Sequence, residues 1–408
     1  MDGEFKRPSR VIKWRPKSSA AQGFQTLVSQ KVSFERYKHI VRSAAPLLLL
    51  ALSCTPTATG GPGATTDSNR SADMRLRSGS AQGVARPPAA RDTRRSATVQ
   101  SDHKDPRARK HAADSADVCR PAKGLLGLAL PTLGTESAPS RSNLQTWVNL
   151  LASSALRGRK AGTADSRRAA GLIAEQFQAL GATPPGATGY CDSFQTQQVR
   201  DQNVVAHVPA SDSRCPWVVV GAHYDALGTD ENGVMYPGAD DNASGVAVLM
   251  ELARLVQVGA VQPKVGLVLV AFGAEEAGLV GSRAYVRHPS VPLTDVSMMI
   301  NVDMAGRKPA GYPIVGYEVY GRNMTRSSHR VRMAAANAKV RAVPAQLGDR
   351  SDSSSFAPHV PTVFFCTMVH ADYHKPTDLP DRVDFAQTMR TLALVTAMVE
   401  GMPCASPP

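Results

Sequence analysis

From residue 143 onward, the chain alternates between short continuous apolar runs and longer stretches with an apolar residue every three or four positions. The continuous runs are rich in Val, Ile and Phe, which is typical of strands buried on both faces of a sheet. The spaced stretches predict amphipathic helices. Because strands and helices alternate, we expect an α/β fold, a three-layer α/β/α sandwich with a mixed, mostly parallel central sheet.

Four apolar runs predict strands, and the periodic stretches between and around them predict helices. The predicted strands are WVVVGAHYD (217–225), VGLVLVAFGAEE (265–276), SMMINVDMAG (297–306) and VPTVFFCTMV (360–369). The predicted helices cover 143–153, 166–181, 245–256, 277–286, 328–340 and 384–402. We expect Ser166 to cap the second of these helices and Gly181 to end it. The expected domain therefore covers 143–408.

The first 140 residues differ in composition, with 23 Lys and Arg against 11 Asp and Glu, so they hold about +12 of the formal net charge of +13. A basic folded surface would indicate a nucleic-acid partner. Residues 55–142, however, are rich in Ala, Gly, Pro, Ser, Thr and Arg and show no apolar period. They predict a disordered basic linker, and we expect no nucleic-acid partner.

An apolar run, PLLLLALS (46–53), follows Arg36, Lys38 and Arg42 and ends at Cys54. With about ten apolar residues it is too short for a membrane-spanning helix. Basic, apolar and then small residues is the order of an export signal. The Ser53-Cys54 junction resembles a lipoprotein cleavage site. We therefore expect 1–54 to be an export segment whose start is uncertain. The exported chain would be periplasmic, anchored to the membrane through acylated Cys54, or secreted. A short buried helix is the alternative.

The six cysteines do not form a CxxC pair, so a thiolate zinc site is not expected. Export permits disulfides, but acylation of Cys54 would leave an odd number, and the pairing stays open. The cysteines are Cys54, Cys119, Cys191, Cys215, Cys366 and Cys404.

Acidic and histidine side chains stand at or just after the ends of the four predicted strands. In strand order they are His223 and Asp225, then Glu275 and Glu276, then Asp303, and last His374. The adjacent acids Asp240 and Asp241 lie in a Gly-rich loop after the first strand. Because the carboxyl ends of parallel strands form one edge of a sheet, we expect these side chains to share that edge.

Histidines and carboxylates together are a ligand set for zinc, cobalt or manganese. One ion needs only three protein ligands, so five candidates suit two ions that share one carboxylate. Each residue alone has an ordinary explanation, such as a helix cap, a core histidine or a polar turn. Their occurrence together on successive strand ends favours a metal centre.

The motifs GAHYD, PGADDNASG, FGAEEAGLVGS, INVDMAG and DYHKPTD, in this order, resemble the dizinc aminopeptidase family and are similar to bacterial leucyl aminopeptidases. The likeness covers roughly residues 143–402. It implies two zinc ions (Zn2+) per chain and a peptide substrate. By residue, it implies that His223 and Asp303 bind one ion, that Glu276 and His374 bind the other, that Asp240 bridges both, that Glu275 is the general base, that Asp225 orients His223, and that the Asp240–Asp241 peptide is cis.

The function implied by the resemblance is a zinc-dependent aminopeptidase that removes N-terminal residues from peptides. A carboxypeptidase of the same family is the main alternative, with Arg307, Arg322 and Arg350 as candidates to bind the substrate carboxylate. A glutaminyl cyclase and a non-catalytic relative are further alternatives. In the segment SDSSSF, Ser353 stands where many relatives carry His, which leaves the substrate pocket open.

Overall fold

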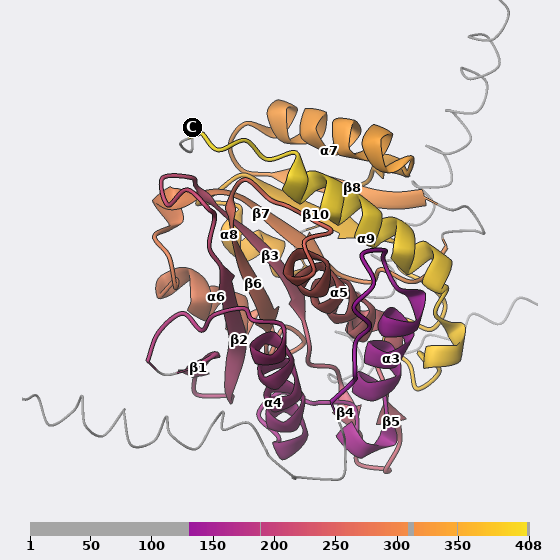
Figure 1. The fold of residues 1–408 in the computed structure, drawn as a ribbon. Helices are drawn as coiled ribbons and strands as arrows, with labels where there is room; N and C mark the ends of the chain where they lie inside the picture. Colours follow the sequence, from indigo (N-terminus) through magenta and orange to yellow (C-terminus); the bar gives the residue numbers. More distant parts are fainter. Residues whose placement is uncertain (1–129, 188, 309–313, 349, 406–408) are drawn as a thin grey trace, which may run out of the picture. The chain divides into compact units, whose positions relative to one another are not determined.

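The computed structural model of the chain describes residues 130–405, except 188, 309–313 and 349. These residues form an eight-stranded mixed sheet with helices on both faces (Figure 1). The expected α/β/α architecture is therefore confirmed. The predicted export segment, Cys54 and the linker up to residue 129 lie outside the described residues.

The sheet has the strand order β1-β2-β6-β3-β7-β10-β8-β9. Its four central strands, β6, β3, β7 and β10, run parallel to one another, and they are the four strands that the apolar runs predict. The antiparallel strands β1, β2 and β8 and the outermost β9 were not predicted individually. A separate hairpin joins β4 (Gly228–Thr229) and β5 (Met235–Tyr236). The bounds of the sheet strands are β1 (Cys191–Gln195), β2 (Arg200–Val208), β3 (Trp217–His223), β6 (Gly266–Phe272), β7 (Val296–Val302), β8 (Ile314–Tyr320), β9 (Arg341–Pro344) and β10 (Thr362–Cys366).

Helices cover both faces of the sheet (Figure 1). The larger apolar core joins the sheet to α3 (Arg141–Leu151), α4 (Ala164–Ala179), α5 (Gly245–Gln257), α7 (Met324–Ala338) and α9 (Phe385–Glu400). On the other face, a smaller core includes side chains of α6 (Val280–Arg287) and α8 (Ser353–Phe356). Within the described part of the chain, no helix is both long and apolar enough to cross a membrane.

Helix α4 begins earlier than its sequence pattern predicts. Its N-cap is Thr163, whose hydroxyl accepts a hydrogen bond from the Ser166 backbone N–H at 3.2 Å. The predicted cap, Ser166, is instead a buried residue within the first turn, where its hydroxyl donates to Asp201. Gly181 follows the C-cap residue Leu180 and has a positive φ of 72°, as expected for a residue that stops a helix.

The described part of the chain makes contacts before the expected domain start at Asn143. The guanidinium of Arg254 on α5 donates hydrogen bonds to the carbonyl oxygens of Gly134, Glu136 and Ala138 at 3.1, 2.6 and 2.8 Å. The same guanidinium pairs with Glu251 at 2.6 Å, so its charge is neutralised within the core. This buried ion pair holds the segment that leads into α3 against α5.

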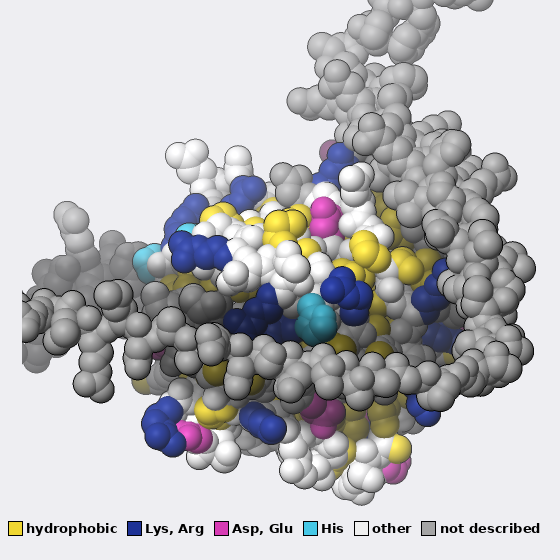
Figure 2. Space-filling model, turned by 90° about the horizontal axis from the view of Figure 1, so that it is seen from above, with side chains coloured by type: hydrophobic (Ala, Val, Ile, Leu, Met, Phe, Trp, Pro, Cys, Tyr) yellow, Lys and Arg dark blue, Asp and Glu magenta, His cyan; other side chains and the backbone are white. Residues whose placement is uncertain are grey.

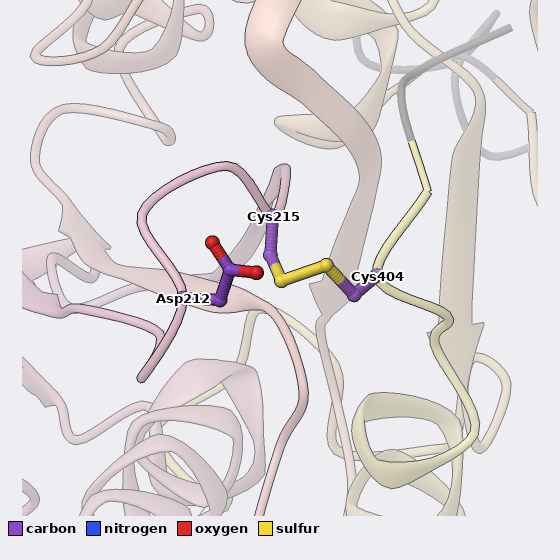
Figure 3. A group of neighbouring side chains, drawn as sticks. All are labelled: Asp212, Cys215 and Cys404. Carbon is purple, nitrogen blue, oxygen red and sulfur yellow. A yellow bond between two sulfur atoms is a disulfide. The ribbon is translucent and has the colours of Figure 1, made fainter.

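A disulfide joins Cys215, just before β3, to Cys404 in the C-terminal tail (Figure 3). Asp212 lies beside the two sulfur atoms, but its carboxylate pairs with Arg214 at 2.8 Å. Because both sulfurs are committed to the covalent bond, this group is a cross-link and not a metal site. The cross-link closes a loop of 189 residues around the sheet.

Replacing Cys215 and Cys404 together by Ser is expected to lower the free energy of unfolding by about 2–4 kcal/mol. Without the cross-link, the unfolded chain gains conformational entropy, and this gain is larger for a longer loop. Thermal unfolding of the oxidised protein and the double variant measures this difference. The buried free cysteine Cys366 offers the control, since a Cys366→Ala variant keeps the cross-link. Equal melting temperatures for the double variant and the unsubstituted chain would contradict the expectation.

Candidate metal centre

The carboxyl ends of the four central strands carry the polar side chains singled out in the sequence. His223 is the last residue of β3, and Asp303 directly follows β7. Glu275 and Glu276 lie in the turn after β6, and His374 lies in the loop after β10. The side chain of His374 is 39% exposed, and the other four residues are about nine-tenths buried or more. The parallel strands therefore deliver these side chains to one edge of the sheet.

The side chains form two groups that share the carboxylate of Asp241. In each group the donor atoms lie within 4.8 Å of one another. Asp241 Oδ1 lies 3.3 Å from His223 Nε2, which lies 3.3 Å from Asp303 Oδ1. Asp241 Oδ2 lies 3.3 Å from His374 Nε2, which lies 3.1 Å from Glu276 Oε2. Each oxygen of Asp241 thus faces one pair made of a histidine and a carboxylate.

The carboxylate shared by the two groups belongs to Asp241, one residue beyond Asp240, which the family resemblance predicts for that position. The fully buried Asp240 accepts a 2.6 Å hydrogen bond from the Gly306 N–H through Oδ1, and its Oδ2 lies 3.2 Å from His370 Nε2. Its carboxylate is therefore occupied away from His223 and His374. The cis peptide is correspondingly Asp241–Asn242 and not Asp240–Asp241.

The loop that carries Asp241 is fixed through its backbone. The carboxylate of Asp378 accepts hydrogen bonds from the N–H groups of Asp240, at 3.0 Å, and Asp241, at 3.1 Å. Asn242 Oδ1 accepts the Gly245 N–H at 2.9 Å, so the helix cap considered from the sequence coexists with the acidic pair. Burial, reinforced by the charge of Asp240, raises the pKa of Asp378 to about 6.

Asp225 organises the turn after β6 and also holds a histidine. Its carboxylate accepts the N–H of Glu275 at 2.9 Å and of Glu276 at 3.2 Å. Its backbone carbonyl lies 3.3 Å from His223 Nδ1, closer than its carboxylate at 3.7 Å. A carbonyl only accepts, so this contact places the proton of His223 on Nδ1 and leaves Nε2 with its lone pair toward Asp241. The expected contact between Asp225 and His223 is thus made mainly by the backbone.

Three supporting residues were missed from the sequence. Ser351 donates a 2.7 Å hydrogen bond to Asp303 Oδ2, which leaves Oδ1 facing His223. Asp378 holds the acidic loop, as described above. Arg159, which is fully buried, donates to the carbonyls of Tyr224 at 2.6 Å, Leu151 at 2.6 Å, Pro237 at 2.7 Å and Gly238 at 3.0 Å. Burial lowers the pKa of Arg159 to about 10. Nearby carboxylates oppose this effect, and the largest opposing contribution comes from Asp225.

The loop that carries His374 is anchored by Asp372. Its carboxylate accepts hydrogen bonds from Arg307 at 2.6 Å, Thr377 at 2.8 Å and Arg382 at 3.1 Å. Burial would raise the pKa of Asp372, but the hydrogen bonds from Arg307 and Thr377 and the arginine charges outweigh it and lower that pKa to about 2. Arg307 is therefore committed to the loop.

The site brings carboxylates together with little water to separate their charges. Burial raises the pKa of Glu276 to about 7 and that of the neighbouring Asp352 to about 7, and it raises the pKa of Glu275 well above its usual value. Asp303 and Asp352 add to the effect on Glu275 through like-charge repulsion. Divalent cations would offset this repulsion, and nitrogen and oxygen donors around a shared carboxylate suit zinc. The residues present therefore fit a pair of metal ions.

Residues 203–399 match peptidase family M28. This matched segment is just under half of the chain, and we refer to it as the M28 domain. The match includes every residue of the two groups that share Asp241, and it confirms the family resemblance drawn from the sequence motifs.

Two curated proteins illustrate the relatives of the M28 domain. The chain is 40% identical over 112 residues to the uncharacterized protein YfbL of Escherichia coli, which covers 26% of this chain and 32% of YfbL. It is 36% identical over 138 residues to the probable lipoprotein aminopeptidase LpqL of Mycobacterium tuberculosis, and this alignment covers 33% of this chain and 25% of LpqL. The chain thus spans about a third or less of the length of these relatives.

Among solved structures, the M28 domain resembles BSAP, a zinc aminopeptidase from Bacillus subtilis. The TM-score is 0.54 at 17% sequence identity, and the superposition covers 67% of this chain and 98% of BSAP. At this identity the likeness establishes the fold.

Proposed function

We propose that the chain is a zinc-dependent aminopeptidase that hydrolyses the N-terminal peptide bond of its substrates and holds two zinc ions. The observation that carries the proposal is the Asp241 carboxylate, whose two oxygens each face a histidine–carboxylate pair beside Glu275. BSAP and LpqL, both described as aminopeptidases, support it.

In this proposal His223, Asp303 and Asp241 would hold one ion, and Glu276, His374 and Asp241 would hold the other. Bound zinc polarises the substrate carbonyl and lowers the pKa of water from 15.7 to about 7. The acidic loop and the turn after β6 hold the side chains in place through Asp378 and Asp225, so little rearrangement is needed before chemistry.

Glu275 acts as the general base in this proposal. Its backbone N–H is held by Asp225, directly beside the proposed ligand Glu276. No described residue makes a hydrogen bond or ion pair with the Glu275 carboxylate, so that group is available to accept the proton of the attacking water. The same carboxylate then donates that proton to the leaving amine, so the proton is conserved across the step. Tyr373 stacks on His374 with ring centroids 3.8 Å apart, and burial raises the pKa of its phenol, so the hydroxyl stays protonated and can donate to a developing oxyanion.

Two of the three arginines considered for a carboxypeptidase are placed unfavourably for that role. Arg307 pairs with Asp372 at 2.6 Å, and Arg322 lies two residues after the end of β8, at the amino edge of the parallel strands. Glu275 and the five proposed ligands are all retained, which supports hydrolysis over a binding-only relative. We therefore retain the aminopeptidase as the proposal.

The activity is tested with purified full-length protein and three forms of one peptide: unmodified, blocked at the N-terminus and amidated at the C-terminus. We expect release of the N-terminal residue from the unmodified and amidated forms, and no cleavage of the N-blocked form. Dialysis against a chelator should abolish the release, and zinc should restore it. Cleavage of the N-blocked peptide, or release of C-terminal residues, would contradict the assignment.

We also propose that the chain is exported and tethered through acylated Cys54. The order of residues before Cys54 and the description of LpqL as a probable lipoprotein support this. Metabolic labelling with an alkyne fatty acid tests it, with Cys54→Ala as the control. Equal labelling of both chains would contradict the tether.

A further inference from the structure

Helix α7 begins at the edge of the sheet opposite the metal centre. Strand β8 runs antiparallel to β10, and Tyr320 at the end of β8 pairs with Thr362 at the start of β10. The chain turns from Tyr320 into α7, so the beginning of α7 lies at the amino edge of the parallel strands. The metal ligands His223 and Asp303 lie at their carboxyl edge. The beginning of α7 and the metal centre therefore lie at opposite ends of the sheet, and the helix then runs back along the sheet toward β9, whose first residue Arg341 pairs with Ile314.

Positive charge is concentrated on and around α7. Residues 141–408 as a whole are nearly neutral, with 24 Lys and Arg against 23 Asp and Glu. Between Glu318 and Asp349, however, there is no carboxylate side chain and there are six cationic ones. Among the described residues, no carboxylate forms a salt bridge with any of these six. They are Arg322, Arg326, Arg330, Arg332, Lys339 and Arg341.

Two flexible apolar side chains protrude from the same helix. Met324 and Met333 are each 51% exposed, and they are two of the four exposed large hydrophobic residues in the described part of the chain. Figure 2 views the molecule from the side on which α7 lies in Figure 1, and it shows Lys and Arg side chains interspersed with hydrophobic ones. We use the name α7 face for five exposed residues on the start and the solvent-exposed sides of the helix, which are Arg322, Arg326, Arg332, Met324 and Met333. Basic and apolar side chains together are typical of surfaces that bind anionic membranes.

A small pocket beside the α7 face has the chemistry of an anion site. It is lined by Arg326, Ser327 and Arg330 together with Ser297 at the start of β7. Ser327 is 1% exposed, and no hydrogen bond from its hydroxyl is found to any described residue. Burial, and next the charge of Arg326, lower the pKa of Arg330. A phosphate between the two guanidiniums would relieve their repulsion and accept the hydroxyl hydrogen bond.

We propose that the α7 face docks on an anionic phospholipid surface, with a lipid phosphate bound between Arg326 and Arg330. Met324 then enters the headgroup region, where its apolar side chain leaves water. Because the beginning of α7 lies at the sheet edge opposite the metal centre, docking through that end of the helix leaves the centre facing the aqueous phase and open to soluble peptides. The proposal depends on the described domain and not on the proposed activity.

Vesicle sedimentation of the full-length protein tests the docking. We compare phosphatidylcholine vesicles with vesicles that contain 30% phosphatidylglycerol, at ~0.15 M salt where charges are screened beyond about 8 Å. The triple variant Arg322→Glu, Arg326→Glu, Arg332→Glu should bind the anionic vesicles at least ~10-fold more weakly, because each cation near the surface contributes several-fold to binding. The matched control is Lys264→Glu, Arg283→Glu, Arg287→Glu, which changes the same charge at other exposed positions and should bind as the unsubstituted chain does.

The two triple variants separate the α7 face from the basic first 140 residues, because both retain that region unchanged. An equal loss of binding in both variants, or equal binding to both kinds of vesicle, would overturn the proposal. So would binding of inorganic phosphate or acidic polypeptides without binding of vesicles, since the site would then serve a different anion. An unchanged melting temperature of the α7-face variant shows that its fold is intact. If that melting temperature falls, the double variant Arg322→Gln, Arg326→Gln provides a milder change of charge.

The orientation is tested with an environment-sensitive dye on Met324→Cys and, separately, on Val369→Cys, which is 42% exposed in the loop after β10. The unsubstituted chain treated with the same dye gives the background. On anionic vesicles we expect the emission of the Met324 label to shift to shorter wavelength and that of the Val369 label to stay as in water. A shift confined to the Val369 label would contradict the orientation.

Discussion

Replacing Asp241 by Asn is expected to remove most of the bound zinc and to abolish peptide hydrolysis. Its two carboxylate oxygens each lie 3.3 Å from a different histidine nitrogen, so one side chain serves both groups. An Asn side chain offers one weakly donating oxygen and no negative charge, so neither group keeps a complete ligand set. Plasma emission spectroscopy after dialysis gives zinc per chain, and the peptide assay gives turnover.

The neighbouring acid provides the matched control. In Asp240→Asn the remaining carbonyl oxygen can still accept the hydrogen bond that Gly306 donates to Oδ1. We therefore expect zinc affinity to fall by no more than about 10–100-fold, the effect typical of residues that support ligands. Loss of zinc from Asp240→Asn with retention in Asp241→Asn would show that the bridging ligand had been assigned to the wrong residue.

Replacing Glu275 by Gln is expected to leave the zinc content unchanged and to lower kcat by about 10²–10⁴-fold, the usual contribution of a general base. The amide is close to the carboxylate in size, and the hydrogen bond that Asp225 accepts comes from the backbone, so the turn should keep its shape. What is lost is a group that accepts a proton from water. Zinc analysis, single-turnover kinetics and the melting temperature distinguish this loss from unfolding.

The adjacent Glu276→Gln variant separates the two roles. Glu276 Oε2 lies 3.1 Å from His374 Nε2, within one of the two groups, so this variant should lose zinc as well as activity. Unchanged kcat in Glu275→Gln would eliminate that residue as the base. Equal zinc loss in both variants would indicate that both glutamates are ligands.

The central sheet was predictable from the sequence because its strands are buried on both faces and read as continuous apolar runs. β3 and β6 are the clearest examples. Strand β1, which pairs with only one neighbour, mixes buried and exposed positions over five residues, CDSFQ, and gives no comparable signal. Sequence pattern therefore identifies the strands that carry the site better than the edge strands that surround it.

The composition of the site was also accessible, but the choice between two adjacent aspartates was not. Asp240 and Asp241 have the same side chain, and their directions depend on the local backbone: Gly238 has a positive φ of 59° and the cis bond lies at Asp241–Asn242. The contacts that distant segments make with the site residues were also not predictable from the sequence. Asp378 contacts Asp240 across 138 residues, and Ser351 contacts Asp303 across 48. Such pairs become neighbours only through the fold.

The central element of the proposed function is a pair of metal ions that share Asp241. Crystals of the purified protein, measured on either side of the zinc absorption edge, would locate the ions without reference to activity. We predict two anomalous peaks ~3.5–4 Å apart on either side of the Asp241 carboxylate, one beside His223 and Asp303 and the other beside Glu276 and His374. A single peak, or peaks centred on Asp240 and His370, would contradict it.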